Sequence, residues 1–505
     1  GSPGAYLRVF HLCGLCGVSR LPSMMKTFSV LLALCACVSL GRRHSRRRHL
    51  TPTGDEESEA LHHGAFVVFA NRTIYLVDPD SAVAFDRIEV DVEKWGDPAA
   101  SGISDEQMGV IPAQYEDKPG ELWTYEFHDH FEIMTKLPLG ERPVHTYWVD
   151  YLHEWWVHPD GDGHFDILSP DDIEKLDFEN LKAYAANPSH GKLVWDEEWA
   201  PIGFATTTED PGIHELDLQK REYIKFHNLS QPIDDSGVGC EGTHAIAHYA
   251  NNEVILIECS RPSDARSIWE FDFERRQPIQ RFNFSGPIYP VPQYENSPWG
   301  YHSSLALVGD KNNDRVHILR KDNASADTEV ISIEVPGGPG KTSFINTVDD
   351  PDAPADWLAF VALESNRSDS GVAVLDLGRI LEGDLTYDVI KVGPGNKYRP
   401  IERGGDRWIA TPVADEETGS YSGLAIIDAL TREFRIVPNI NDTSRLIWMA
   451  DWSHYAEENE IHELHEYIEE LEHRIEQLER TVGSIGNTPS GGERRSLRKL
   501  KSRRA

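Results

Sequence analysis

The feature that most constrains the fold is a β-rich unit that recurs along residues 62–450. Each unit contains a strand-like run, a turn, a second run that ends in Asp or a polar turn, and a further run. Units begin near residues 62, 106, 144, 190, 243, 301, 342 and 398, a period of roughly 40–50 residues. In an all-β chain this period predicts a β-propeller, in which blades of antiparallel strands surround a channel.

The spacing predicts eight blades over residues 60–452, with seven as the alternative because residues 93–125 are irregular. A large β-sandwich is the alternative fold. The segment RLIWMADW, residues 445–452, is expected to supply the strand that closes the ring onto the first blade.

A different pattern follows the propeller, over residues 455–483. Apolar side chains recur there at heptad spacing, at Ile461, Leu464, Ile468, Leu471, Ile475, Leu478 and Val482. β-Branched residues at one seam position and Leu at the other favour a parallel two-stranded coiled coil, so we expect the chain to pair with itself. A single helix packed on the propeller is the alternative. Residues 484–505 are expected to form a disordered basic tail.

The first 50 residues have the composition of a leader. Lys26 precedes the apolar run 28–40, as in a secretory signal peptide, and a basic spacer follows at 42–50. The apolar run is short for a transmembrane helix, and an uncleaved membrane anchor is the alternative. We therefore expect a secreted or extracellular protein, or one retained in the lumen of the secretory pathway.

Cysteine usage and glycosylation signals agree with this compartment. Four of the six cysteines lie in the leader, and only Cys240 and Cys259 remain, which predicts one disulfide bond, with two buried free thiols as the alternative. They flank a predicted hairpin with Asn251 and Asn252 at its turn. Six sequons for N-glycosylation predict a glycoprotein; they begin at Asn71, Asn228, Asn283, Asn323, Asn366 and Asn441.

The charge of the chain limits its partners. The net charge is −35, and residues 51–493 carry all 84 acidic side chains. Such a surface repels nucleic acid and anionic lipid, so no nucleic-acid partner is expected. It suits metal cations or basic partners, although solubility alone would also explain it.

Histidines recur at the predicted blade starts. The innermost strand of a blade lines the channel, so its first residues lie near one mouth. Residues 62–63, His145, His190, His244 and His302 occupy such positions. Neutral imidazole is a common ligand of zinc and of other transition metals, which predicts a metal site. Hydrogen bonding of each histidine to a neighbouring blade is the alternative.

Further motifs carry less chemical information. His128 and His130 form a His-x-His pair, which could bind a metal from a loop. The stretch 158–164 lacks the distal Glu of an EF-hand and is interpreted as a hairpin turn rather than a calcium loop. Nucleophile-elbow, Walker A and HExxH motifs are absent from the sequence, so no catalytic residue is assigned.

Several phrases resemble the bacterial periplasmic β-propeller zinc metallochaperones that accompany a zinc ABC importer. They are HDH (128–130), GERPVHTYWVDYLHEWWVHPDGDGHFDIL (140–168), SHG (189–191) and GCEGTHAIAHYANNEVILIEC (239–259). They cover roughly residues 120–260. The resemblance implies His128, His130, His145, His190 and His244 as metal ligands, whereas His302 rests on the channel argument alone.

Together these observations predict a secreted zinc-binding propeller that carries or scavenges metal without catalysis. A cell-surface or transport protein is a candidate partner. The first alternative is an extracellular interaction scaffold dimerised by the coiled coil. The second is a metal-dependent enzyme that uses the channel site.

Overall fold

The computed structural model describes the propeller residues of the chain. The described ranges are 64–100, 108–127, 131–170, 179–180, 186–284, 286–291, 304–346, 357–368, 370–396, 398–405 and 407–449. The predicted leader, coiled coil and basic tail lie outside these residues, as do His128, His130 and His302. Within the described ranges, no helix has the length and apolarity needed to span a membrane.

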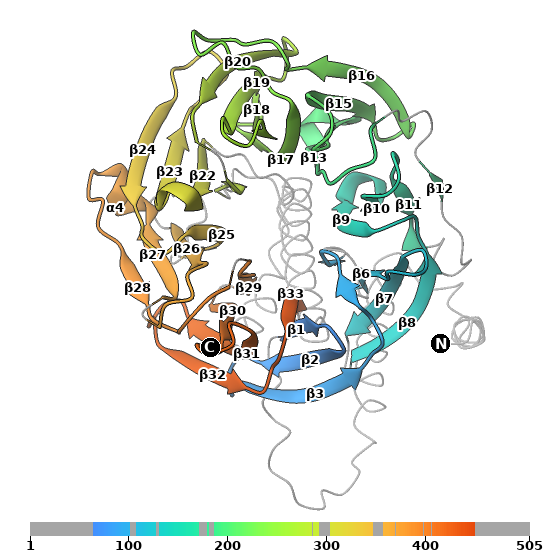
Figure 1. Cartoon of the computed structure of the whole chain (residues 1–505), viewed down its shortest axis with the longest axis vertical. Helices are drawn as coiled ribbons and strands as arrows, with labels where there is room; N and C mark the ends of the chain where they lie inside the picture. Colours follow the sequence, from blue (N-terminus) through green and yellow to red (C-terminus); the bar gives the residue numbers. More distant parts are fainter. Residues whose placement is uncertain are drawn as a thin grey trace, which may run out of the picture. The chain divides into compact units, whose positions relative to one another are not determined.

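The strands assemble into eight antiparallel sheets, which are the blades of a propeller (Figure 1). The expectation of eight blades is confirmed, and the seven-blade and sandwich alternatives are wrong. The strands of the first four blades, from the channel outward, are β33 (Thr443–Met449), β1 (Ala65–Ala70), β2 (Thr73–Asp78), β3 (Val83–Glu89); β4 (Lys94–Trp95), β6 (Met108–Gln114), β7 (Glu121–Phe127), β8 (Phe131–Pro138); β9 (Pro143–Val149), β10 (Glu154–Pro159), β11 (Asp166–Leu168), β12 (Glu179–Asn180); β13 (Leu193–Trp195), β14 (Ile202–Thr206), β15 (Gly212–Asp217) and β16 (Glu222–Asn228).

The other four blades follow the same order. Their strands are β17 (Gly242–Tyr249), β18 (Val254–Arg261), β19 (Ser267–Asp272), β20 (Gln277–Phe282); β21 (Ile288–Pro290), β22 (Leu305–Asp310), β23 (Arg315–Arg320), β24 (Glu329–Glu334); β25 (Pro339–Asn346), β26 (Trp357–Leu363), β27 (Val372–Asp376), β28 (Asp388–Ile390); β29 (Glu402–Gly404), β30 (Trp408–Ala414), β31 (Tyr421–Asp428) and β32 (Phe434–Pro438). β5 (Ala99–Ala100) pairs with β6. The short helices are η2 (Asp150–Leu152), η3 (Glu197–Trp199), η4 (Lys311–Asn313) and α4 (Leu377–Leu381).

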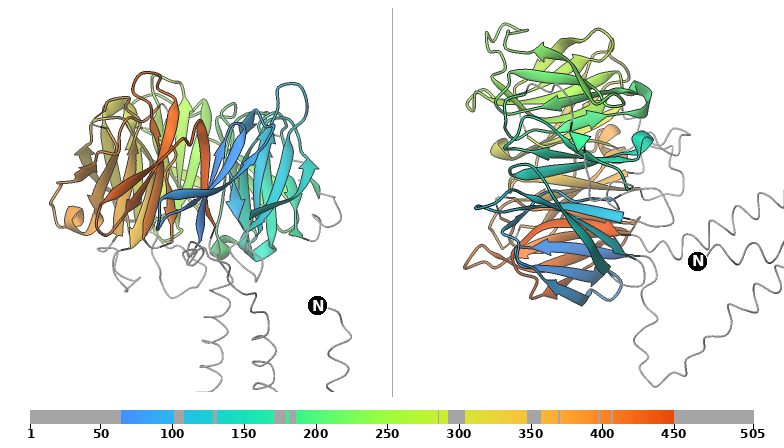
Figure 2. Two further views of the ribbon diagram at one scale, coloured as in Figure 1. Left: turned by 90° about the horizontal axis from the view of Figure 1, so that it is seen from below. Right: turned by 90° about the vertical axis from the view of Figure 1, so that its right-hand side faces the viewer.

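Burial explains why the middle strands are uniformly apolar and the outer strands are not. Every residue of β1 is buried, because a middle strand packs against neighbouring blades on both faces. Most residues of the outermost strand β3 are exposed or half-buried. The core consists of eight apolar clusters, and each cluster is shared by two adjacent blades. In the edge-on views of Figure 2 the strands run across the thickness of the ring.

The ring is closed by a strand from the end of the described chain. β33 pairs with β1, with Phe66 opposite Trp448, as expected for the segment 445–452. Figure 1 shows β33 beside β1. The innermost strand of the first blade is therefore β33, so the interpretation of residues 62–63 as a channel-lining blade start is wrong.

Two other blade starts differ from the predicted ones. The second blade begins at Lys94 with β4, not near residue 106. The sixth blade begins at Ile288 with β21, not near residue 301. The segment that holds His302 precedes β22, the second strand of that blade. The channel argument for His302 is wrong for this reason, and its role as a ligand stays untested because it lies outside the described residues.

The predicted disulfide bond is present in the fifth blade. Cys240 and Cys259 are bonded, their Cα atoms are 5.6 Å apart, and both are buried. The hairpin between them turns at Ala250, Asn251 and Asn252, which all have positive φ. Asn is one of the few non-glycine residues that adopts this conformation readily.

Removing this bond is expected to destabilise the protein. The two cysteines are 19 residues apart, and a loop of this size corresponds to about 3 kcal/mol of unfolding free energy. Chemical denaturation of the double variant C240S/C259S should show this loss. Reductant should lower the stability of the unmodified protein but leave the variant unchanged. Equal stability of the two proteins without reductant would contradict the prediction.

The sequons lie at accessible places. Asn71, Asn228, Asn283, Asn366 and Asn441 are exposed, and Asn323 is half-buried. Each could therefore be reached by a glycosyltransferase, and glycosylation itself stays a prediction.

Candidate metal centre at the channel mouth

Three of the six predicted metal ligands lie together. His145 is the third residue of β9, His190 lies just before β13, and His244 is the third residue of β17. These strands are the innermost strands of three consecutive blades. The ring centroids of His145 and His190 are 4.7 Å apart, and those of His190 and His244 are 4.9 Å apart. We refer to these three residues as the histidine cluster.

A carboxylate holds the Nδ1 side of each ring. The distances are 2.6 Å from His145 Nδ1 to Asp97, 3.0 Å from His190 Nδ1 to Asp160, and 2.9 Å from His244 Nδ1 to Glu258. Carboxylates in these positions fix the orientation of metal-binding histidines and raise their basicity. The Nε2 atoms point away from the carboxylates, and the three rings line the cavity at the channel mouth.

Two of these carboxylates, Asp97 and Asp160, have lowered pKa values and remain ionised. Burial would raise the pKa of Asp97, but Arg445, Lys341 and His145 outweigh burial and hold that pKa well below its usual value. Arg445 approaches Asp97 to 2.5 Å. Burial would also raise the pKa of Asp160, but its hydrogen bond to His190 lowers it overall. Ionised carboxylates require the Nδ1 atoms of His145 and His190 to carry protons and donate them.

This arrangement leaves two lone pairs facing each other. The Nε2 atoms of His145 and His190 are 3.3 Å apart. When both Nδ1 atoms carry protons, neither neutral ring has a proton at Nε2. A proton or a metal cation between the two atoms removes the resulting repulsion. Two imidazoles bound to one tetrahedral zinc, with Zn–N bonds of 2.0–2.1 Å, have nitrogens about 3.3 Å apart, which matches the observed spacing.

Burial keeps two of the three rings neutral. Burial lowers the pKa of His145 to about 3, with Asp97 offsetting part of the effect. Burial also lowers the pKa of His244. Both rings are therefore neutral near pH 7, the form that binds metal.

The histidine cluster is not a completed metal site. Among the described residues, no group of three or more His, Cys, Asp or Glu side chains is placed so that it could hold a metal ion. His145 is nearly buried, whereas the side chains of His190 and His244 are 37% and 30% exposed. The rings of His190 and His244 are partly exposed, and bringing a third nitrogen to a metal held by His145 and His190 would require side-chain movement.

The fold separates the anchors of the His128–His130 loop from the histidine cluster. Phe127 and Phe131 flank this loop and pair at one end of β7 and β8. The other end of β7 pairs beside Gln114, which donates to Pro143 at the start of β9, near His145. A strand of this length spans roughly 20 Å. Phe127 and Phe131 therefore lie at the end of their strands away from the histidine cluster. His128 and His130 lie outside the described residues, and their part in the site stays a prediction.

Sequence analysis missed the three carboxylates that hold the rings. Asp160 lies in the turn between β10 and β11, confirming the hairpin interpretation of residues 158–164. Asp97 and Glu258 carry no local sequence signal that would identify them. Their histidines are 48 and 14 residues away in the chain.

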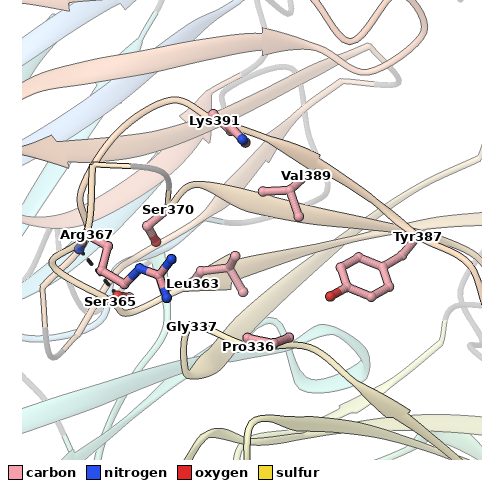
Figure 3. A pocket seen from close by; sticks show the side chains of 9 residues that line it. All are labelled: Pro336, Gly337, Leu363, Ser365, Arg367, Ser370, Tyr387, Val389 and Lys391. Carbon is pink, nitrogen blue, oxygen red and sulfur yellow. Dashed lines mark hydrogen bonds between the residues drawn. The ribbon is translucent and has the colours of Figure 1, made fainter.

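A second cavity lies between the sixth and seventh blades (Figure 3). It measures about 210 Å³ and is lined by Arg367, Tyr387 and Lys391 among other residues. Its lining contains no histidine, cysteine or carboxylate. The channel cavity, of about 570 Å³ and lined by residues of all eight blades, is therefore the candidate site.

No family model matches the sequence, and no curated protein matches it significantly. Solved propellers are similar to it. Apo AztD from Citrobacter koseri is 14% identical over 77% of this chain and 98% of its own, with a TM-score of 0.48. The dihydro-heme d1 dehydrogenase NirN in complex with DHE is 12% identical over 79% of this chain and 77% of its own, with a TM-score of 0.51. The C-terminal WD40 domain of Sif2 is 10% identical over 70% of this chain and 85% of its own, with a TM-score of 0.41.

AztD, from the family that the sequence resembles, is thus among the similar structures. At these identities the comparisons establish the propeller fold and nothing more. The chemistry of the channel must be argued from the residues of this chain.

Proposed function

We propose that this protein is a secreted propeller that binds zinc, or a similar transition metal, at His145, His190 and His244 and acts as a metal carrier or scavenger. The observation that carries the proposal is the pair of Nε2 atoms 3.3 Å apart, each on a ring whose Nδ1 faces a carboxylate. A buried disulfide bond and accessible sequons support a site in an oxidising compartment outside the cytosol. Three protein nitrogens leave the fourth position of a tetrahedral zinc open, so the metal could be released to a receiving protein.

Calorimetric titration of chelator-stripped protein with zinc tests the proposal. We expect saturable binding of one zinc by the channel site, and X-ray absorption of the complex should show imidazole nitrogens as the main protein ligands. Absence of saturable binding, or a zinc environment without imidazole, would overturn the proposal. The interaction-scaffold alternative would then take its place.

The carboxylates give a finer prediction. Glu258→Gln keeps the shape of the side chain but removes the charge that faces His244 Nδ1. Replacing such a partner of a metal-binding histidine lowers affinity roughly 10–100-fold, and we expect a loss in this range by competition against a chelator dye. Glu222→Gln, at an exposed position on β16, is the matched control and should bind zinc normally. Equal affinity of the two variants would show that Glu258 does not support a ligand.

A metal-dependent enzyme is the second candidate function. The cavity of about 570 Å³ beside the histidine cluster is much larger than a metal ion and could hold a substrate next to the open metal position. Zinc-dependent turnover of a substrate would favour this function over carriage.

A further inference from the structure

The lining of the channel cavity is cationic in a chain whose net charge is −35. Six Lys and Arg side chains line it, against three carboxylates. Three of the cations form ion pairs, namely Arg445 with Asp97, Lys311 with Glu364 and Arg261 with Glu209. The other three are Lys192, Lys341 and Arg266, and none of them forms an ion pair with a described residue. A site that bound only a free metal cation would gain nothing from these charges.

Two of these three cations line the cavity from different blades. Lys192 lies two residues after His190, at the start of the fourth blade, and Lys341 lies on β25 in the seventh blade. Both residues are half-buried and line the same cavity. Two half-buried ammonium groups from different blades, directed at one space, are stabilised by an anion between them.

Two phenol side chains also line the cavity. They belong to Tyr289 and Tyr398, and the Lys341 ammonium lies 4.9 Å from the centre of the Tyr398 ring. Burial would lower the pKa of Lys341, but Tyr398 and Asp97 raise it overall, so this ammonium is charged at neutral pH. Ammonium and phenol groups donate hydrogen bonds to carboxylate oxygens.

We propose that the channel cavity binds a small organic anion with two or more carboxylate groups, held by Lys192 and Lys341 beside the histidine cluster. The volume of about 570 Å³ accommodates such a molecule together with a metal ion. Carboxylate oxygens also bind zinc, so one molecule could contact the ammonium groups and fill the open metal position. That shared contact rests on the proposed function, whereas binding to the ammonium groups does not.

The test uses citrate as the probe and the full chain without metal. Citrate is titrated calorimetrically into chelator-stripped protein at pH 7 and low ionic strength, and we expect saturable binding that weakens as salt is added. Lys192→Met and Lys341→Met should each lower the affinity at least 10-fold, because each removes a charge-assisted contact. Lys225→Met, at an exposed position on β16, is the matched control and should bind as the unmodified protein does.

Each outcome decides the proposal. Absence of citrate binding, or equal affinity of all three variants, would overturn it, and tighter binding of inorganic phosphate than of citrate would overturn the assignment to carboxylates. Thermal unfolding of each variant verifies that the propeller is intact. Since no metal is present, failure of this test is distinct from failure of the zinc proposal, which the zinc titration in citrate-free buffer measures separately.

Discussion

Replacing His190 with alanine is expected to lower zinc affinity at least about 100-fold, beyond the effect of losing a carboxylate partner of a ligand. His190 is the central ring of the cluster, with His145 on one side and His244 on the other. Its removal takes away one of the two facing Nε2 atoms and leaves His145 and His244 without the ring between them. His145→Ala and His244→Ala should also weaken binding strongly, because each removes one of three protein ligands.

Two histidines outside the cavity serve as controls. His153 is exposed at the end of η2, with φ of 53°, a conformation that asparagine tolerates, so the control is His153→Asn. His317 is buried on β23 and contacts Ser332 and Phe284, so His317→Ala measures the cost of losing a structural histidine. Calorimetry on chelator-stripped proteins should give unmodified zinc affinity for both. If His190→Ala binds zinc as these controls do, the histidine cluster is not the metal site.

Replacing Lys321 with methionine is expected to lower the free energy of unfolding by about 3–5 kcal/mol, the usual cost of removing one partner of a buried ion pair. Lys321 follows β23 in the sixth blade, and its Nζ lies 2.8 Å from Glu270 on β19 in the fifth blade. Their side chains are 1% and 0% exposed. Thr328 and Tyr249 also donate to Glu270, so removing Lys321 leaves the carboxylate buried with only neutral donors.

The double variant K321M/E270M distinguishes the effect of losing the ion pair from the effect of leaving one charged partner buried alone. Replacing both partners with apolar side chains of similar size removes the buried charge, so its stability should exceed that of Lys321→Met. Urea unfolding measures all three proteins, with Lys225→Met as the exposed control. If Lys321→Met lowers the free energy of unfolding no more than Lys225→Met does, this ion pair does not stabilise the contact between the two blades.

Local patterns were sufficient to predict the propeller. Strand β1 is AFVVFA and is wholly buried, and such short apolar runs between turn residues recur once per blade. The disulfide could also be predicted from the sequence, because only Cys240 and Cys259 lie outside the predicted leader and a hairpin joins them. The strands and the hairpin depend on residues that are close together in the sequence, and a periodic pattern shows such local relations directly.

The innermost strand of each blade could be identified only in the folded structure, where the ring is closed. Because β33 supplies the innermost strand of the first blade, the apolar run at residue 65 is a second strand, although its composition is that of any blade strand. Likewise, β21 has only three residues and gives little periodic signal, so the stronger strand β22 was interpreted as the beginning of the sixth blade. The pattern could identify strands but not their distance from the channel.

The sequence by itself determined that His145, His190 and His244 stand at the starts of consecutive blades, since each precedes or begins a strand at the blade period. Only the tertiary structure decided what surrounds them. Asp97 and Asp160 reach their histidines from 48 and 30 residues away, and Lys341 faces the same cavity from the seventh blade. Closing eight blades into a ring places residues from distant parts of the chain around one axis, and this convergence creates the charge of the cavity and the spacing of the two Nε2 atoms. No local pattern encodes these distances, because they depend on contacts among all the blades.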